Sequence, residues 1–438
     1  MMKLDLERLV RDVESCDGFR VQSRLQVVED GLACALPAAL GDQCRIFEPS
    51  GREIPAEVIG FKRGLARLAP YEFADELRTG LPVVRLPERR TVPVGKGILG
   101  RIFDGLGRPI DGRGPVRPLE RRLVRNTPPS PLHRERVERP FVTGQKAIDG
   151  LLLCGRGQRL GIFAGSGVGK STLLGQIAKT AEADLNVICL VGERGCELRP
   201  FVEDCLGEDG LARSAVVISS SDQLPLMRIR AVETSIAMAD SFRARGMNVL
   251  FFLDSLTRLA MAQREMGLSL GEPPSARGYT PSVFQLLANT VEQLGNGTTG
   301  SITGFLTVLV EGDDLGEPVA DSARSLLDGH IVLDRKIAEA GHFPPINISQ
   351  SVSRAFLNVS EPAQQISARK IRSIMATHAE VQDLIRIGAY VKGSSPQVDK
   401  VIELMPLVNS FLKQGLNEPH SLADTLAAMQ RLAAAWPF

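Results

Sequence analysis

The stretch Ala164–Thr172, with the sequence Ala-Gly-Ser-Gly-Val-Gly-Lys-Ser-Thr, constrains this chain more than any other. A strand-like apolar run, Leu160–Phe163, precedes it, and a helix-like run, Thr172–Lys179, follows it. Glycines in a turn between a strand and a helix let backbone N–H groups point inward around phosphate oxygens. The positive end of the following helix faces the same anion. The stretch therefore predicts a phosphate-binding loop that takes a nucleoside triphosphate.

Within this loop, Lys170 is expected to reach the β- and γ-phosphates, and the Ser171 hydroxyl is expected to ligate Mg²⁺. The strict motif begins with Gly, whereas this chain has Ala164, which fits if the position requires a small side chain rather than a positive φ. A glycine-rich structural turn is the alternative. The residues expected to bind the nucleotide here are Gly165, Ser166, Gly167, Val168, Gly169, Lys170, Ser171 and Thr172.

Hydrolysis requires acidic groups outside this loop, and the sequence offers two. Asp254 ends a fully apolar run, so its carboxylate is expected at a sheet edge beside the loop, where it holds Mg²⁺ directly or through water. A strand-terminal Asp that caps the next helix is the alternative. Glu193 and Arg194 follow the strand-like run Val187–Val191. Glu193 would accept the proton of the attacking water and Arg194 would lie near the γ-phosphate, unless the two form an ordinary surface pair.

A cation that meets the charge developing on the γ-phosphate would complete the site. Arg354 ends the stretch Gln350–Arg354, just past the predicted sheet. An arginine supplied by a neighbouring subunit contributes roughly 10³- to 10⁵-fold in rate. These residues alone leave a structural role for Arg354 equally open.

The composition is that of an ordinary globular protein, with 24% charged and 43% hydrophobic residues in 438. This length predicts two or three domains, and the net charge of +1 gives no case for nucleic acid as a partner. No apolar stretch reaches the ~20 residues of a membrane span. The seven cysteines contain no CxxC pair, so buried, reduced thiols of a cytosolic protein are expected rather than a metal or redox site.

The pattern along the chain divides it into four segments. Residues 1–20 predict an amphipathic helix, which either packs on its own domain or docks a partner. Residues 21–95 contain six short β-prone runs, typical of a small β-barrel or sandwich. Residues 96–352 begin with a turn-rich stretch and a Pro- and Arg-rich connector, Pro115–Pro140, interpreted as a solvated linker rather than a nucleic-acid patch. They continue with alternating strands and helices, which predict a parallel sheet covered on both faces. Residues 353–438 are predicted to be helical, with Ser421 and Asp424 as a capping box.

Together these parts resemble the ring ATPases related to the catalytic subunit of rotary ATP synthase, and within them the flagellar and type III secretion export ATPase. Ala164 stands where the synthase β subunit usually has Gly, and Gly388–Ser394 stands where that subunit carries an acidic lever motif. The resemblance covers nearly the whole chain. Its motifs are Ala164–Thr172, Gly192-Glu193-Arg194, Asp254–Arg258, Gly278–Phe284, Leu327–Leu333 and Ser351–Arg354.

The resemblance implies a RecA-like P-loop ATPase core, an N-terminal β-barrel domain and a C-terminal helical domain, assembled as a homohexamer. It implies that Phe343 stacks on adenine, although a core Phe before a Pro turn is the alternative from the residues alone. It also implies that Arg354 is a finger donated across the subunit interface. Because Glu193 and Arg354 occur in one sequence, each chain carries both halves of a composite site, which favours a ring of identical chains.

The function implied is Mg²⁺-dependent ATP hydrolysis that releases cargo from chaperones and energises protein export. The implied partners are a regulator at the N-terminal helix, a central stalk in the ring pore facing Gly271–Phe284, an export gate and chaperone–cargo complexes. No nucleic acid is expected. The implied location is cytoplasmic, at the inner face of the bacterial plasma membrane.

Three other functions compete with this one. A rotary synthase subunit is disfavoured by the absent acidic motif and by the complete composite site. A Rho-like RNA-dependent ATPase would need a basic, aromatic N-terminal domain, whereas aromatic residues are only 5% of the chain. A scaffold that only binds nucleotide is disfavoured because Lys170, Glu193, Asp254 and Arg354 are all present.

Overall fold

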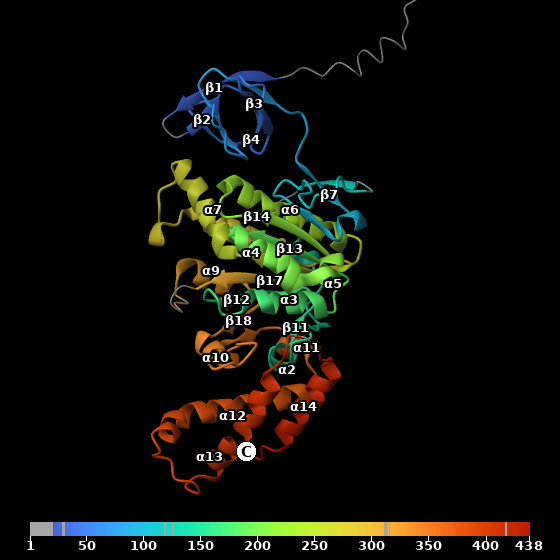
Figure 1. Cartoon of the computed structure of the whole chain (residues 1–438), viewed down its shortest axis with the longest axis vertical. Helices are drawn as coiled ribbons and strands as arrows, with labels where there is room; N and C mark the ends of the chain where they lie inside the picture. Colours follow the sequence, from blue (N-terminus) through green and yellow to red (C-terminus); the bar gives the residue numbers. More distant parts are fainter. Residues whose placement is uncertain are drawn as a thin grey trace, which may run out of the picture.

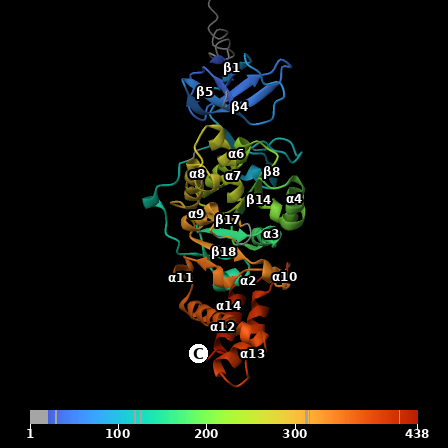
Figure 2. The same cartoon turned by 90° about the vertical axis from the view of Figure 1, so that its left-hand side faces the viewer.

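A computed structural model describes residues 21–28, 31–117, 120–124, 127–310, 314, 316–416 and 418–438. A small β-barrel, an α/β core and a helical part are stacked in this order along the long axis (Figures 1 and 2). The helix predicted over residues 1–20 lies outside the described residues. The fold class predicted from the sequence is confirmed by this architecture.

The first part is a closed barrel with the strand order β1-β2-β5-β4-β3-β6. Of the two folds predicted for it, a barrel or a sandwich, the structure therefore has the barrel. Each strand overlaps one of the six predicted β-prone runs, with boundaries that differ by a few residues. Alternate residues point inward, and Ile46, Ile54, Val58 and Val83 are fully buried at its centre. The strands are β1 Gln22–Val28, β2 Gly31–Cys34, β3 Gln43–Phe47, β4 Glu53–Lys62, β5 Leu65–Pro70 and β6 Pro82–Arg85.

The core is a sheet with the order β19-β18-β12-β17-β15-β13-β14-β8, parallel except for β19 and for β16, which pairs with β17. Its strands are β8 Arg101–Phe103, β12 Arg159–Ala164, β13 Leu185–Val191, β14 Ser214–Ser219, β15 Asn248–Asp254, β16 Gly295–Asn296, β17 Ser301–Leu309, β18 Gly329–Leu333 and β19 Val352–Ser353.

Helices cover both faces of this sheet, which explains why its strands are apolar throughout. On one face, Phe251 packs in a cluster with α6, α7, α8 and α9; on the other, Phe252 packs in a cluster with α2 and α3. The helices are α2 Lys146–Leu151, α3 Lys170–Thr180, α4 Gly195–Pro200, α5 Gly207–Ala212, α6 Pro225–Arg243, α7 Leu256–Ser269, α8 Pro281–Glu292, α9 Pro318–Leu326 and α10 Arg335–Glu339.

Most described residues of the connector are exposed, as expected of a solvated linker, but several of its side chains bind the core. Within it, β9 (Glu120–Leu123) pairs with β7 (Thr91–Val94), and Arg122 forms an ion pair with Asp240 of α6. Arg134 donates from Nη1 to the carbonyl of Leu294, 3.2 Å away, at the end of α8. Arginines of the connector thus donate to carbonyls at the end of a helix and form ion pairs with acidic side chains. The charge count alone could not show these contacts. Farther along, β10 (Pro140–Phe141) pairs with β11 (Cys154–Gly155).

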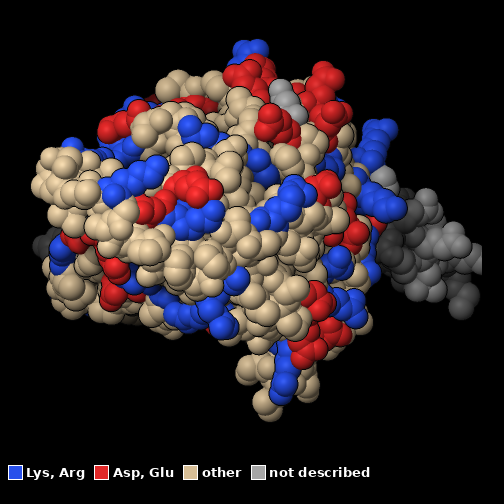
Figure 3. Space-filling view, turned by 90° about the horizontal axis from the view of Figure 1, so that it is seen from below, with Lys and Arg blue, Asp and Glu red and all other residues tan. Residues whose placement is uncertain are grey.

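The last part consists of α11 Phe356–Val359, α12 Pro362–Arg386, α13 Pro396–Leu412 and α14 Leu422–Ala434. Ser421 caps α14 as predicted, because its hydroxyl accepts from the N–H of Asp424 at 3.1 Å. Acidic and basic side chains are interspersed on the face seen from this end (Figure 3). Among the described residues, none of the helices has the length and apolar character needed to span a membrane.

Candidate active site

The phosphate loop follows the carboxyl end of β12 in the middle of the parallel sheet. Ala164 is the last residue of this strand, is 1% exposed and has a negative φ. A small side chain is therefore what this position requires, and Ala meets that need as well as Gly. The turn depends instead on Gly167 and Gly169, whose φ values are 77° and 100°, in the region that other residues rarely adopt. α3 begins at Lys170, so its N-terminus faces the loop.

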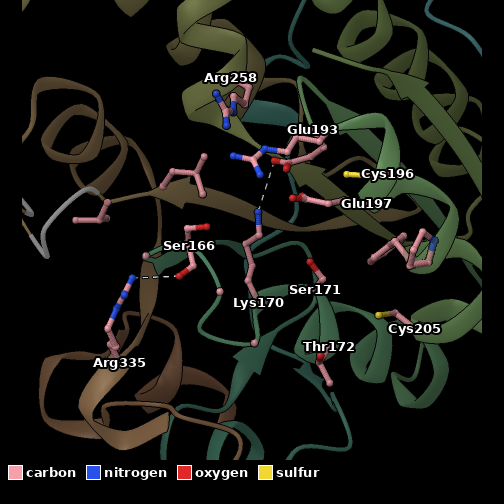
Figure 4. A pocket seen from close by; sticks show the side chains of 18 residues that line it. Ser166, Lys170, Ser171, Thr172, Glu193, Cys196, Glu197, Cys205, Arg258 and Arg335 are labelled. Carbon is pink, nitrogen blue, oxygen red and sulfur yellow. Dashed lines mark hydrogen bonds and ion pairs between the residues drawn. The ribbon is translucent and has the colours of Figure 1, made fainter. Parts of the chain in front are cut away.

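A cavity of about 900 Å³ opens over this loop (Figure 4). Its walls come from the phosphate loop, the segment after β13, the start of α7, the end of β17 and the start of α10. The size suits a nucleotide, because small-molecule sites usually enclose ~300–1,000 Å³. The residues that line it include Gly165, Ser166, Gly167, Gly169, Lys170, Ser171, Thr172, Glu193, Arg194, Cys196, Glu197, Phe201, Arg258 and Arg335.

Three predicted site residues meet at the back of this cavity. The Lys170 ammonium forms an ion pair with the Asp254 carboxylate and lies 3.7 Å from Oε1 of Glu193. The Thr307 hydroxyl, on β17, donates to Asp254 at 2.6 Å. Asp254 and Glu193 come together because β15 and β13 are parallel neighbours, and the carboxyl ends of such strands meet at one edge of the sheet. The sequence placed this pair correctly.

Glu193 is suited to take a proton. Burial raises its pKa, the charge of Asp254 raises it further, and Lys170 and Arg258 lower it in part. The Oε1 atom of Glu193 is buried and has no hydrogen-bond partner among the described residues. A carboxylate with a raised pKa and an unsatisfied oxygen in a cavity is a candidate general base.

Arg194 lines the cavity beside Glu193, as the sequence predicted. Three further residues of the cavity were given no role from the sequence. Arg258 lies in the first turn of α7, the helix that begins just after Asp254, so its closeness in sequence to Asp254 could have signalled its position. Arg335 donates to the carbonyl of Ser166 at 3.1 Å. The two residues are far apart in the sequence, so no local pattern could have predicted this contact. Cys196 is exposed and lines the cavity, so the expectation of buried thiols was wrong there.

Arg354 lies far from the phosphate loop of its own chain. Its N–H donates to the carbonyl of Asp328 at 3.0 Å, and Asp328 pairs with Arg159, the first residue of β12. The phosphate loop begins after the last residue of β12, five residue steps and roughly 16 Å farther along. Arg354 is exposed and is absent from the lining of the cavity. This geometry brings Lys170, Glu193, Arg194 and Asp254 together and leaves Arg354 apart.

Phe343 also lies outside the cavity lining. Its side chain is 52% exposed, which argues against a core Phe, and its carbonyl accepts from the N–H of Gln414 at 3.0 Å. The ring is therefore available to stack on a ligand that extends beyond the phosphate loop.

The donor set around the loop fits Mg²⁺, which prefers oxygen ligands and retains several waters. Ser171 brings a hydroxyl to the cavity, and Asp254 brings a nearly buried carboxylate. Glu193 lines the same cavity, where its Oε1 atom has no hydrogen-bond partner among the described residues and lies 3.7 Å from the Lys170 ammonium.

Comparison with known proteins agrees with this geometry. Residues 144–353 match the nucleotide-binding domain of the ATP synthase alpha/beta family, and residues 360–431 match the C-terminal domain of the type III secretion ATPase EscN. The chain is 48% identical to the flagellum-specific ATP synthase of Bacillus subtilis, over 97% of this chain and 98% of that protein. It is 42% identical to the type 3 secretion system ATPase of Sinorhizobium fredii, over 91% and 88%.

Solved structures extend the comparison. The assembled ATPase EscN of the enteropathogenic E. coli type III secretion system superposes with a TM-score of 0.88 and 39% identity, over 94% of this chain and all of that one. EscN in complex with its central stalk EscO superposes with a TM-score of 0.86 and 39% identity, again over 94% of this chain and all of that one. The C-terminal match favours this relationship over a rotary synthase subunit or a Rho-like ATPase. The chain belongs to the family of flagellum-specific and type III secretion ATPases, and it is an ATP-hydrolysing enzyme.

Proposed function

We propose that this chain is the ATPase of a flagellar or type III protein export apparatus and that it works as a ring of six identical chains. The position of Arg354 carries the proposal. This arginine cannot serve the phosphate loop of its own chain, whereas a neighbouring chain in a ring can receive it. EscN, similar over nearly the whole length, is described as an assembled ATPase.

In this proposal each residue of the cavity has one role. The backbone of Gly165–Gly169 cradles the phosphates, and Lys170 leaves Asp254 to neutralise the β- and γ-phosphates. Glu193 accepts a proton from the attacking water, and Arg194 lies near the γ-phosphate. Ser171 and Asp254 would hold Mg²⁺, which would neutralise phosphate charge when bound.

The base of ATP is proposed to stack on Phe343, and Arg354 of the next chain would meet the charge that develops on the γ-phosphate. The stacking role requires that ATP extends from the phosphate loop toward Phe343. The exposure of both side chains supports these roles.

A stalk protein is the proposed partner of the ring pore, because EscN binds its central stalk EscO. The candidate segment is Pro273–Arg277, which is exposed, while Tyr279 behind it is buried and donates to Glu317 at 3.0 Å. Arg277 pairs with Asp314 at 3.2 Å, which ties this segment to the loop before α9. The other proposed partners are a regulator at the N-terminal segment, the export gate and chaperone–cargo complexes, on the cytoplasmic side of the membrane.

Affinity capture of the full chain from its own cells tests the export role. Recovery of flagellar rod and filament chaperones supports flagellar export, and recovery of effector chaperones supports virulence export. Recovery of synthase γ-type subunits instead contradicts the proposal.

A further inference from the structure

The segment between α13 and α14 brings the C-terminal helical part to the nucleotide site. Gln414, only 7% exposed, lies near its start, two residues after the end of α13. Its side-chain oxygen accepts from the N–H of Lys146 at 2.9 Å, and its amide nitrogen donates to the carbonyls of Gly144 at 2.8 Å and Glu418 at 2.7 Å. The side-chain amide is thus bonded at both ends, which fixes its orientation.

The backbone of the same residue holds Phe343, because the N–H of Gln414 donates to the Phe343 carbonyl at 3.0 Å. One residue later, the carbonyl of Gly415 accepts from the side chain of Gln176 at 3.4 Å. Gln176 lies one turn along α3 from Thr172, which lines the cavity, so both lie on one face of the helix. Gln414 therefore lies just beyond the cavity, in the direction of Phe343.

The bond between the Gln414 side chain and the Gly144 carbonyl also connects Gln414 to α3. Gly144 follows Thr143, whose carbonyl accepts from the Thr180 hydroxyl at 2.6 Å, at the end of this helix. Gln414 consequently joins three segments distant in sequence: the turn at residues 143–146, the segment that carries Phe343 and the C-terminal helical part.

We infer that Gln414 is a positioning residue for the base of ATP. It holds Phe343 at a fixed place relative to the phosphate loop, so that base and phosphates are bound together. The inference rests on the proposed stacking of adenine on Phe343. It makes the C-terminal helical part a contributor to base recognition, although none of its described residues lines the cavity over the phosphate loop.

Gln364 provides a matched control. It is also a buried glutamine that joins the C-terminal helical part to the core, and its amide donates to the carbonyls of Asp149 at 2.8 Å and Gly150 at 3.0 Å. No hydrogen bond links it to Phe343. Gln364→Ala and Gln414→Ala therefore each remove side-chain bonds between the C-terminal helical part and the core. Only the second removes the anchors of the residue whose main-chain N–H holds Phe343, and alanine keeps that main-chain bond.

The experiment measures equilibrium binding of ATP and of inorganic tripolyphosphate, together with steady-state hydrolysis, in the full-length variants. Gln414→Ala should weaken ATP binding and raise KM about five- to tenfold, because the main-chain bond to Phe343 remains but the residue that donates it is no longer anchored to the turn at residues 143–146. Its kcat and its tripolyphosphate binding should stay within about twofold, because both depend on the phosphate end. Gln364→Ala should leave all four quantities within about twofold of wild type.

Equal weakening of ATP and tripolyphosphate, or an ATP affinity equal to that of Gln364→Ala, overturns the inference. If the wild-type chain binds ATP but does not hydrolyse it, the proposed function fails and the binding comparison still decides the role of Gln414. If Gln414→Ala does not fold, Gln414→Glu keeps the size and the acceptor for Lys146, loses the two donated bonds and is judged by the same comparison.

Discussion

Lys170 lies 3.7 Å from Glu193 while it is paired with Asp254, so the ammonium is shared between the proposed general base and the proposed magnesium ligand. All three side chains are nearly buried. The ion pair compensates the two buried charges. In the proposed mechanism, phosphate oxygens would replace Asp254 as the partner of Lys170, and a metal ion would replace Lys170 as the partner of Asp254. The same three groups thus hold one another in place beside the phosphate loop.

The first prediction concerns Asp254. Asp254→Asn removes the proposed metal-side charge and should lower kcat at least about 100-fold, because the phosphate charge is then poorly neutralised. The Mg²⁺ concentration needed for half-maximal activity should rise. Asp184→Asn, at the opposite edge of the sheet, serves as the control and should change neither value. A wild-type Mg²⁺ dependence in Asp254→Asn would rule out this carboxylate as a metal ligand.

The second prediction separates binding from turnover at Glu193. Glu193→Gln keeps the shape but cannot accept a proton, so kcat should fall about 10²- to 10⁴-fold while ATP affinity stays within a few-fold. Filter binding of ATP and phosphate release measure the two quantities. Normal hydrolysis by this variant would remove Glu193 from the mechanism.

The third prediction follows from the raised pKa of Glu193. A general base acts as the carboxylate, so kcat/KM should rise with pH and level off above the pKa of the free enzyme. The midpoint of this acid limb should lie above the ~4.3 of an ordinary glutamate. The residual activity of Glu193→Gln should lack the limb, and an unchanged limb would assign the titration to another group.

The fourth prediction concerns the contact between barrel and core. Arg230 of α6 donates to Glu57 of β4 at 2.9 Å and to Glu233 at 2.6 Å, and Arg90 also pairs with Glu233. Arg230→Ala leaves two buried carboxylates without this partner and should lower the free energy of unfolding by about 3–5 kcal/mol.

Chemical denaturation measures this effect, and Arg45→Ala is its control. The Arg45–Glu53 pair is about half exposed, so its loss should cost less than about 1 kcal/mol. Equal effects of the two variants would show that the buried network contributes no special stability.

Much of this molecule could be predicted from the chain. Continuous apolar runs marked the five central strands of the core sheet, β12, β13, β14, β15 and β17, and the small residues before Lys170 marked the loop, because these signals are local. The strands β8, β16, β18 and β19 were not predicted. The order of the strands could not be predicted, since it depends on packing between distant segments. Arg335 and Gln414 escaped notice for the same reason: each acts through a backbone group more than 100 residues away in sequence. The arginines of the connector showed only their charge, not the helix ends that they cap.

The fifth prediction tests the composite site directly. Glu193→Gln and Arg354→Ala should each be nearly inactive alone, since the first lacks the base and the second lacks the finger for its neighbour. If the two chains are mixed before assembly, roughly a quarter of the interfaces combine an intact Glu193 with an intact Arg354 from the next chain.

The decisive measurement is therefore ATP hydrolysis by an equimolar mixture of these two variants, assembled together and compared with each variant alone. The account predicts recovery to as much as roughly a quarter of the wild-type rate if the sites act independently. A mixture no more active than its two components at any ratio would contradict an arginine donated between chains.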